Sequence, residues 1–235
     1  MTAPMPSEPD YTVWESIDYQ PAITDLLPNR LLPFLRPASV LLDVGCNTGG
    51  VALFLAERGH ACTGLDINPA AIAAAKDRAS RHRLAASASF EITDLRDFNS
   101  PDRFHAVLMT RYLTCMPQLE HWRASLDKAF ALIRPDGLIY IHDFVCDPGS
   151  PVYGARYAQG KANGWRDGNF AVHDASAELL FVAHHHSASD LAEITAPYET
   201  LLLEQHDSLS MNGNPCRMFE FIGRKPHDST TPRTS

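Results

Sequence analysis

Two glycines and a carboxylate about twenty residues later are the residues of this sequence best suited to holding a nucleotide-like ligand. Gly45 and Gly49 lie in the turn that follows the apolar run 40–44. A glycine lets the backbone bend sharply and lets a ligand approach without interference from a Cβ atom. Asp66 ends a second apolar run, 61–65, where a carboxylate can accept hydrogen bonds from both hydroxyls of a ribose. The spacing therefore predicts a nucleotide site.

The order of the glycines distinguishes between two kinds of nucleotide. A dinucleotide fold requires the pattern G-x-G-x-x-G, whereas this chain has Asn47 at the middle glycine. Asn tolerates a positive φ, so the turn can form, but its side chain would crowd a pyrophosphate resting on the backbone. A nicotinamide-dependent oxidoreductase is therefore disfavoured and remains as an alternative.

The stretch from Asp43 to Gly49, Asp-Val-Gly-Cys-Asn-Thr-Gly, resembles the first motif of the class I S-adenosylmethionine-dependent methyltransferases, which usually reads Asp-Val-Gly-Cys-Gly-Thr-Gly. The turn 132–137, Leu-Ile-Arg-Pro-Asp-Gly, also resembles that family. The resemblance implies S-adenosylmethionine as the cofactor, with Asp94 taking the adenine amino group and Leu95 packing on the ring. The implied cofactor-binding residues are Asp43, Gly45, Cys46, Asn47, Gly49, Asp66, Ile67, Asp94, Leu95 and Thr110.

These residues need parallel strands to bring them to one edge of a sheet. Apolar runs at 40–44, 61–65, 89–93, 104–109 and 138–141 alternate with helical patterns at 50–58, 69–81 and 118–133. This alternation predicts an α/β fold with a doubly wound, mostly parallel sheet. Two further apolar strands, 199–203 and 218–222, flank the turn 212–215 and predict an antiparallel closing hairpin. We therefore expect seven strands, with the final one antiparallel.

The regions around this sheet are expected to select the methyl acceptor. We divide the chain into a cover segment at 1–38 that includes a helix at 23–35, a methyltransferase domain at 39–224, and a polar tail at 225–235. Within the domain, an acceptor-side insertion at 145–186 holds a long glycine-rich loop, 149–168, and a hairpin of strands 169–173 and 179–184. Ser187 is expected to cap a helix that ends at Thr195.

Aromatic and titratable residues gather where the strand–helix alternation stops. The predicted substrate-binding residues are Tyr11, Trp14, Tyr19, Arg111, Tyr112, Tyr153, Tyr157 and Trp165. The predicted catalytic residues are His142, Asp143, His184 and His186, with His142 and Asp143 expected to face one crevice and to deprotonate or orient an acceptor. A strand-end polar pair is the alternative for His142 and Asp143. No metal site is expected, because adjacent histidines lack helical i, i+4 spacing.

Composition narrows the substrate class. The formal charge of −8 argues against a broad nucleic-acid surface, so a small-molecule acceptor is favoured. Five scattered cysteines and the lack of a long apolar run predict reduced thiols and a cytoplasmic protein without a membrane span. The leading hypothesis is an S-adenosylmethionine-dependent methyltransferase. A non-catalytic S-adenosylmethionine-binding protein is a further alternative, and the oligomeric state stays open.

Overall fold

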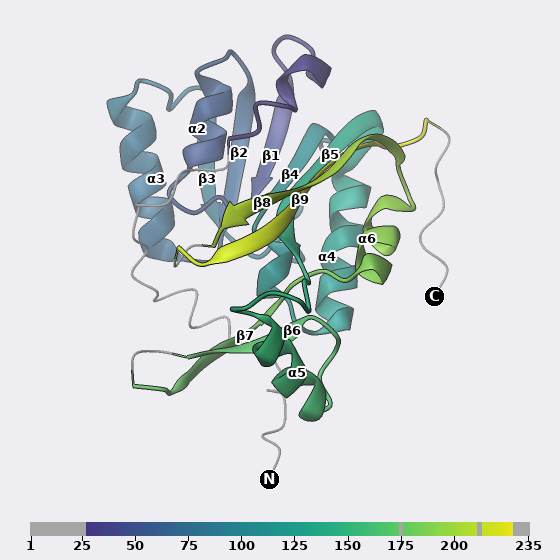
Figure 1. The fold of residues 1–235 in the computed structure, drawn as a ribbon. Helices are drawn as coiled ribbons and strands as arrows, with labels where there is room; N and C mark the ends of the chain where they lie inside the picture. The colour runs from purple at the N-terminus through teal and green to yellow at the C-terminus, as the bar shows by residue number, and fades with distance from the viewer. Residues whose placement is uncertain (1–26, 174–175, 211–212, 228–235) are drawn as a thin grey trace.

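The main sheet has seven strands and is flanked by helices, with a small hairpin sheet beside it (Figure 1). The computed structural model describes residues 27–173, 176–210 and 213–227. The order of the strands across the main sheet is β3-β2-β1-β4-β5-β9-β8. Their bounds are β1 Val40–Val44, β2 Ala61–Asp66, β3 Ala88–Ile92, β4 Phe104–Thr110, β5 Ile133–Val145, β8 Glu199–Leu209 and β9 Pro215–Arg224.

Strand direction confirms the predicted sheet. β1 pairs in parallel with β2 and β4, and the parallel pairing continues to β3 on one side and to β5 on the other. β9, the last strand in the described residues, is antiparallel to both β5 and β8. The order reverses at β1, which leaves β2 on one side and β4 on the other. A crevice at this point, beyond the carboxyl ends of the strands, is where open α/β sheets bind ligands.

Two apolar clusters hold helices against the two faces of the sheet. One cluster contains Trp122, Ile139 and Ile141 and includes residues of α4 (Leu119–Leu132) and α6 (Ala188–Thr195). The other contains Leu55 and Tyr140 and includes residues of α2 (Gly50–Ala56) and α3 (Pro69–Arg81). Successive residues of β5 therefore face opposite sides, as the pleat of a strand requires.

The predicted helix starts at Asn68 and Ser187 are confirmed. The Asn68 side chain accepts hydrogen bonds from the backbone N–H groups of Ala70 and Ala71, and Pro69 takes the first helical position, where its missing N–H costs little. Ser187 begins α6 with a capping box, in which its side chain and that of Asp190 each accept the other residue's backbone N–H. Both caps fix the directions in which the chain leaves the sheet.

Two predicted elements are wrong. The part of the predicted helix 23–35 that the structure describes forms only the 3-10 turn η1 (Leu32–Phe34), because prolines at 28 and 33 remove backbone donors. The predicted loop 149–168 contains α5 (Gly154–Ala162). Its Gly160 packs so closely on β6 that an added Cβ would lie 2.2 Å from the carbonyl oxygen of Asn169, so this glycine permits close packing.

The predicted hairpin is confirmed as β6 (Asn169–His173) paired with β7 (Leu179–His184). Figure 1 shows it together with α5 below the end of the main sheet to which β1 points. An isolated bridge between Val145 and His186 joins this unit to the end of β5. None of the helices in the described residues combines the length and apolar character needed to cross a bilayer.

Candidate functional site

A mostly apolar pocket of about 830 Å³, counted to its open mouth, lies at the carboxyl ends of β1, β2 and β4. Residues predicted from the sequence to bind a cofactor line it, together with two predicted for the acceptor: Gly45, Asp66, Ile67, Asp94, Leu95, Thr110, Arg111 and Tyr112. The fold therefore brings together residues that are separated by nearly 70 positions in the chain.

The glycine-rich turn leaves room for a neighbouring aromatic ring. Gly45 has a φ of 68°, and an added Cβ would come within 3.0 Å of Cδ2 of Tyr112. Asn47 has a φ of 51°, which confirms that an asparagine can occupy this turn. The Asp43 carboxylate accepts the backbone N–H of Ala52 at 3.2 Å and so fastens the turn to α2. Asp43 and Asn47, with Cys46 and Gly49, shape the turn but lie outside the pocket lining.

The Asp66 carboxylate has two acceptor positions that no hydrogen bond from the described residues fills. Its Oδ2 accepts the backbone N–H of Asn47 at 2.8 Å, and its Oδ1 accepts that of Asn68 at 2.9 Å. Each carboxylate oxygen can accept two hydrogen bonds, so one acceptor position remains on each. Burial raises the pKa of Asp66, and these backbone N–H groups oppose that rise. The arrangement fits two neighbouring hydroxyl groups of a ribose.

The Asp94 carboxylate accepts more hydrogen bonds than that of Asp66 and leaves fewer acceptor positions for a ligand. Its Oδ1 accepts both the backbone N–H and the Nε–H of Arg96, at 2.8 and 3.0 Å, while its Oδ2 accepts one guanidinium N–H at 2.8 Å. One acceptor position on Oδ2 is left, which fits a single donor such as an adenine amino group. Burial tends to raise the pKa of Asp94, but the contacts with Arg96 hold it below its usual value. Asp94 therefore stays ionised.

The segment that follows β4 forms a further part of the pocket wall. Thr110 ends β4, and its Oγ1 is buried without a hydrogen-bond partner among the described residues. Arg111 has a φ of 53° and donates its backbone N–H to the carbonyl oxygen of His142. The next turn, η2 (Leu113–Cys115), brings Thr114, Cys115 and Met116 to the pocket, and sequence reasoning did not select these three. The one feature of the sequence that could have identified them is their position shortly after the end of a predicted strand.

His142 and Asp143 face opposite sides of β5, so the prediction that they share a crevice is wrong. His142 lies on the face of Tyr140, whereas Asp143 lies on that of Ile141. The Asp143 carboxylate accepts the backbone N–H groups of Thr114 and Phe144, at 3.2 and 2.8 Å. Asp143 is fully buried and fastens η2 to β5.

A chain of polar groups runs across β5, β9 and β8 on the His142 face. His142 Nε2 lies 3.2 Å from His206 Nε2, and His142 Nδ1 lies 3.4 Å from the hydroxyl of Tyr140. That hydroxyl donates to Glu220 at 2.9 Å, and Glu220 also contacts Arg30 at 3.4 Å. Burial, followed by His206, lowers the pKa of His142 to about 4, so its ring is neutral at pH 7.

His184 and His186 are fully buried outside the pocket lining, beside α6. His184 contacts the side-chain Oδ1 of Asn169 at 2.7 Å through Nδ1 and the Asp190 carboxylate at 3.1 Å through Nε2. Burial lowers the pKa of His184 to about 4, although Asp190 opposes this shift. His186 Nε2 lies 3.7 Å from an oxygen of Asp143.

Candidate metal-binding atoms of His184, His186 and Asp190 lie within 4.8 Å of one another. However, Arg166 pairs with one oxygen of Asp190, and the backbone N–H and hydroxyl of Ser187 both donate to the other. Neither carboxylate oxygen is therefore readily available to a cation. The expectation of no metal site stays a prediction.

Three of the aromatic residues predicted to contact the acceptor lie away from the pocket. Tyr153 and Tyr157 belong to a buried cluster with Phe170, and the Tyr157 hydroxyl lies 2.6 Å from Nδ1 of His185. Trp165 is also buried, and none of these three aromatic residues lines the pocket. Tyr11, Trp14 and Tyr19 lie outside the described residues.

Known proteins are similar to this chain in part of its sequence and in its fold. Residues 41–137 match the model of a family described as a methyltransferase domain. A S-adenosylmethionine-dependent methyltransferase from Methanosarcina mazei has the same architecture, with a TM-score of 0.80 and 25% identity over 87% of this chain and 100% of that one. The described part of the chain therefore has the class I methyltransferase fold. Asp66 and Asp94 lie at its pocket with the acceptor positions described above.

Two other similar proteins show what the class I fold leaves open. A 2-heptyl-1-hydroxyquinolin-4(1H)-one methyltransferase of Mycobacteroides abscessus is 38% identical over 78 residues, which are 33% of this chain and 34% of that protein. The match thus spans about a third of that relative's length. The [4+2]-cyclase SpnF has a TM-score of 0.58 at 19% identity, over 82% of this chain and 77% of that one. The class I fold alone therefore does not fix the reaction.

Proposed function

We propose that this protein transfers a methyl group from S-adenosylmethionine to a small-molecule acceptor. The observation that carries the proposal is the pocket at the strand ends, where Asp66 keeps two acceptor positions and Asp94 keeps one. Two neighbouring hydroxyls and one amino group of an adenosine match these three positions. A nicotinamide dinucleotide would also need room for a pyrophosphate over the turn, where Asn47 has a side chain.

The residues of the pocket mainly have to hold and orient the reactants. When bound, S-adenosylmethionine supplies a methyl group that its sulfonium has already activated. Ile67 and Leu95 offer apolar surface for the adenine ring, and Gly45 keeps the turn clear next to Tyr112. Correct alignment of two reactants can lower a barrier by roughly 7 to 11 kcal/mol. Few catalytic side chains are then needed.

The acceptor side of the proposed reaction lies over the ends of β4 and β5. Arg111 and Tyr112 line the pocket there, and the backbone of Arg111 is bonded to that of His142. The His142 ring does not line the pocket, because its two nitrogens lie beside Tyr140 and His206. We therefore propose that His142 orients the acceptor side through its backbone bond to Arg111, while Asp143, which binds the backbone of Thr114, positions the pocket wall.

Two segments complete the proposed acceptor site. Arg30, in the segment 1–38, contacts Glu204 at 2.6 Å and Glu220 at 3.4 Å, and so connects that segment to the polar chain that contains His142. The insertion 145–186 adjoins the end of β5 through the bridge between Val145 and His186. We propose that these segments set acceptor choice for a catalytic domain at 39–224, followed by a tail at 225–235. The net charge of −8 supports an acceptor other than a nucleic acid.

A transfer experiment tests the proposal. The protein is incubated with S-adenosylmethionine that carries an isotopically labelled methyl group and with fractions of a metabolite extract, which are then analysed by mass spectrometry. We expect label in a small molecule and an equal amount of S-adenosylhomocysteine. The variant Asp66→Asn serves as a control that should slow the transfer. Cofactor binding without any labelled product would favour the non-catalytic alternative.

A further inference from the structure

A second cleft lies at the opposite end of the main sheet from the methyl-donor pocket. It occupies about 750 Å³, counted to its open mouth, and its lining is mostly polar. The residues come from the segments just before and within the starts of β1, β4 and β5, and from the end of β9. Those that carry the argument are Arg36, Ser39, His105, Arg134, Asp136 and Arg224.

Two guanidinium groups in this cleft have no partner in the described part of the chain. Neither Arg36 nor Arg134 forms a side-chain hydrogen bond or an ion pair with another described residue, and the Nε of Arg134 is fully buried. Arg224, in contrast, pairs with Glu199 at 3.0 Å. A buried donor that lacks a partner is costly, so an acceptor from a ligand would stabilise Arg134. The cleft thus offers two uncompensated positive charges next to the single carboxylate of Asp136.

His105 adds a neutral donor to the same lining. Its Nδ1 accepts the backbone N–H of Val40 at 3.0 Å, which leaves the ring hydrogen of the neutral imidazole on Nε2. Burial lowers the pKa of His105, and Arg134 and Arg36 lower it further. Both arginines and this ring line the same cleft.

We propose that this cleft binds a phosphate group, either free or as a monoester, through Arg36 and Arg134. A guanidinium presents N–H donors in a planar fork that matches two oxygens of a phosphate, and a pair of guanidiniums matches a dianion. The carboxylate of Asp136 would repel a second anionic group, so it favours a ligand that places a hydroxyl or amino group there. Since the cleft and the methyl-donor pocket lie at opposite ends of β1, the phosphate group is distinct from the cofactor.

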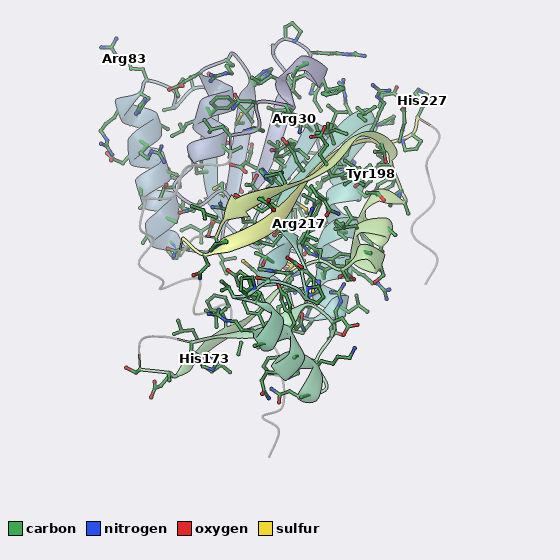
Figure 2. The ribbon with its side chains drawn as sticks, in the orientation of Figure 1. Arg30, Arg83, His173, Tyr198, Arg217 and His227 are labelled. Carbon is green, nitrogen blue, oxygen red and sulfur yellow. The ribbon has the colours of Figure 1, made fainter. Side chains whose placement is uncertain are left out.

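Binding of inorganic phosphate to the full chain, followed by calorimetry, tests the site. We expect saturable binding that weakens with added salt and that falls about tenfold for each of Arg36→Gln and Arg134→Gln, because each removes a charge-assisted contact. Arg83→Gln is the matched control, since Arg83 is an exposed arginine at the far corner of the molecule, beyond α3 (Figure 2). This variant should bind phosphate within twofold of the wild type.

Two further measurements keep the result decisive. Binding of S-adenosylhomocysteine at the other end of the sheet should be unchanged in Arg36→Gln and Arg134→Gln, which shows that the variants are folded. A phosphate monoester of glycerol is compared with inorganic phosphate, and tighter binding of the ester would identify an esterified ligand. Acetate binding as tightly as phosphate would overturn the assignment. So would equal phosphate affinity in the wild type and in both arginine variants, or no saturable binding to the wild type.

Discussion

Replacing Asp66 tests how the cofactor is held. The Asp66 carboxylate accepts two backbone N–H groups and keeps one acceptor position on each oxygen, which we assign to the ribose hydroxyls. Asp66→Asn keeps the size of the side chain but removes its charge and turns one acceptor into a donor. A hydrogen bond to a charged group contributes about 1.5 to 3 kcal/mol, so we expect affinity for S-adenosylhomocysteine to fall roughly ten- to hundredfold.

Isothermal titration of S-adenosylhomocysteine into both proteins measures this loss. Asp102→Asn is the matched control, because Asp102 is exposed and lies outside the pocket lining. The free energy of unfolding of each variant is measured in parallel, since Asp66 also fastens Asn47 and Asn68. An Asp66→Asn variant that binds within twofold of the wild type would refute the assignment of Asp66 to the ribose.

Three other changes have defined outcomes. Asp94→Asn should weaken S-adenosylhomocysteine about three- to tenfold by calorimetry, because it loses a charged acceptor and its pairing with Arg96; unchanged affinity would place the adenine elsewhere. Gly45→Ala should lower the free energy of unfolding by about 1 to 2 kcal/mol in urea, since alanine disfavours a φ of 68° and its Cβ would crowd Tyr112 at 3.0 Å. The folded-state pKa of His142 is about 4, against 6.5 when unfolded, so only the unfolded chain gains this proton as the pH falls through that window. His142 should then contribute about 3 kcal/mol of stability above pH 6.5 that is lost by pH 4. The free energy of unfolding of His142→Gln should fall less between pH 6.5 and 4 than that of the wild type. An identical fall in both proteins would contradict the assignment of this pKa to His142.

Local sequence signals predicted the elements that position the cofactor. Asn68 followed by Pro69 marked the start of α3, and Ser187 marked that of α6, because both signals depend on neighbouring residues alone. Asp66 and Asp94 could be placed at the pocket because each ends or follows a strand of a parallel sheet. Signals from neighbouring residues were therefore sufficient to predict the elements around the cofactor pocket.

Contacts between distant parts of the chain were beyond those rules. The α5 helix lies in a stretch rich in glycine, and its close packing on Asn169 is visible only in three dimensions. The pleat of β5 could have shown that His142 and Asp143 point to opposite faces. No sequence signal placed Arg36 beside Arg134, which lies almost 100 residues later. Burial of His184 likewise depended on the direction in which β7 faces.

The most direct test of the central claim compares three ligands by thermal and chemical unfolding of the full chain. S-adenosylmethionine and S-adenosylhomocysteine at about 100 times their dissociation constants should each raise the free energy of unfolding by about 2.7 kcal/mol. NAD at the same concentration should leave it unchanged, because the turn carries Asn47 where a pyrophosphate would rest. Stabilisation by NAD alone would contradict the account.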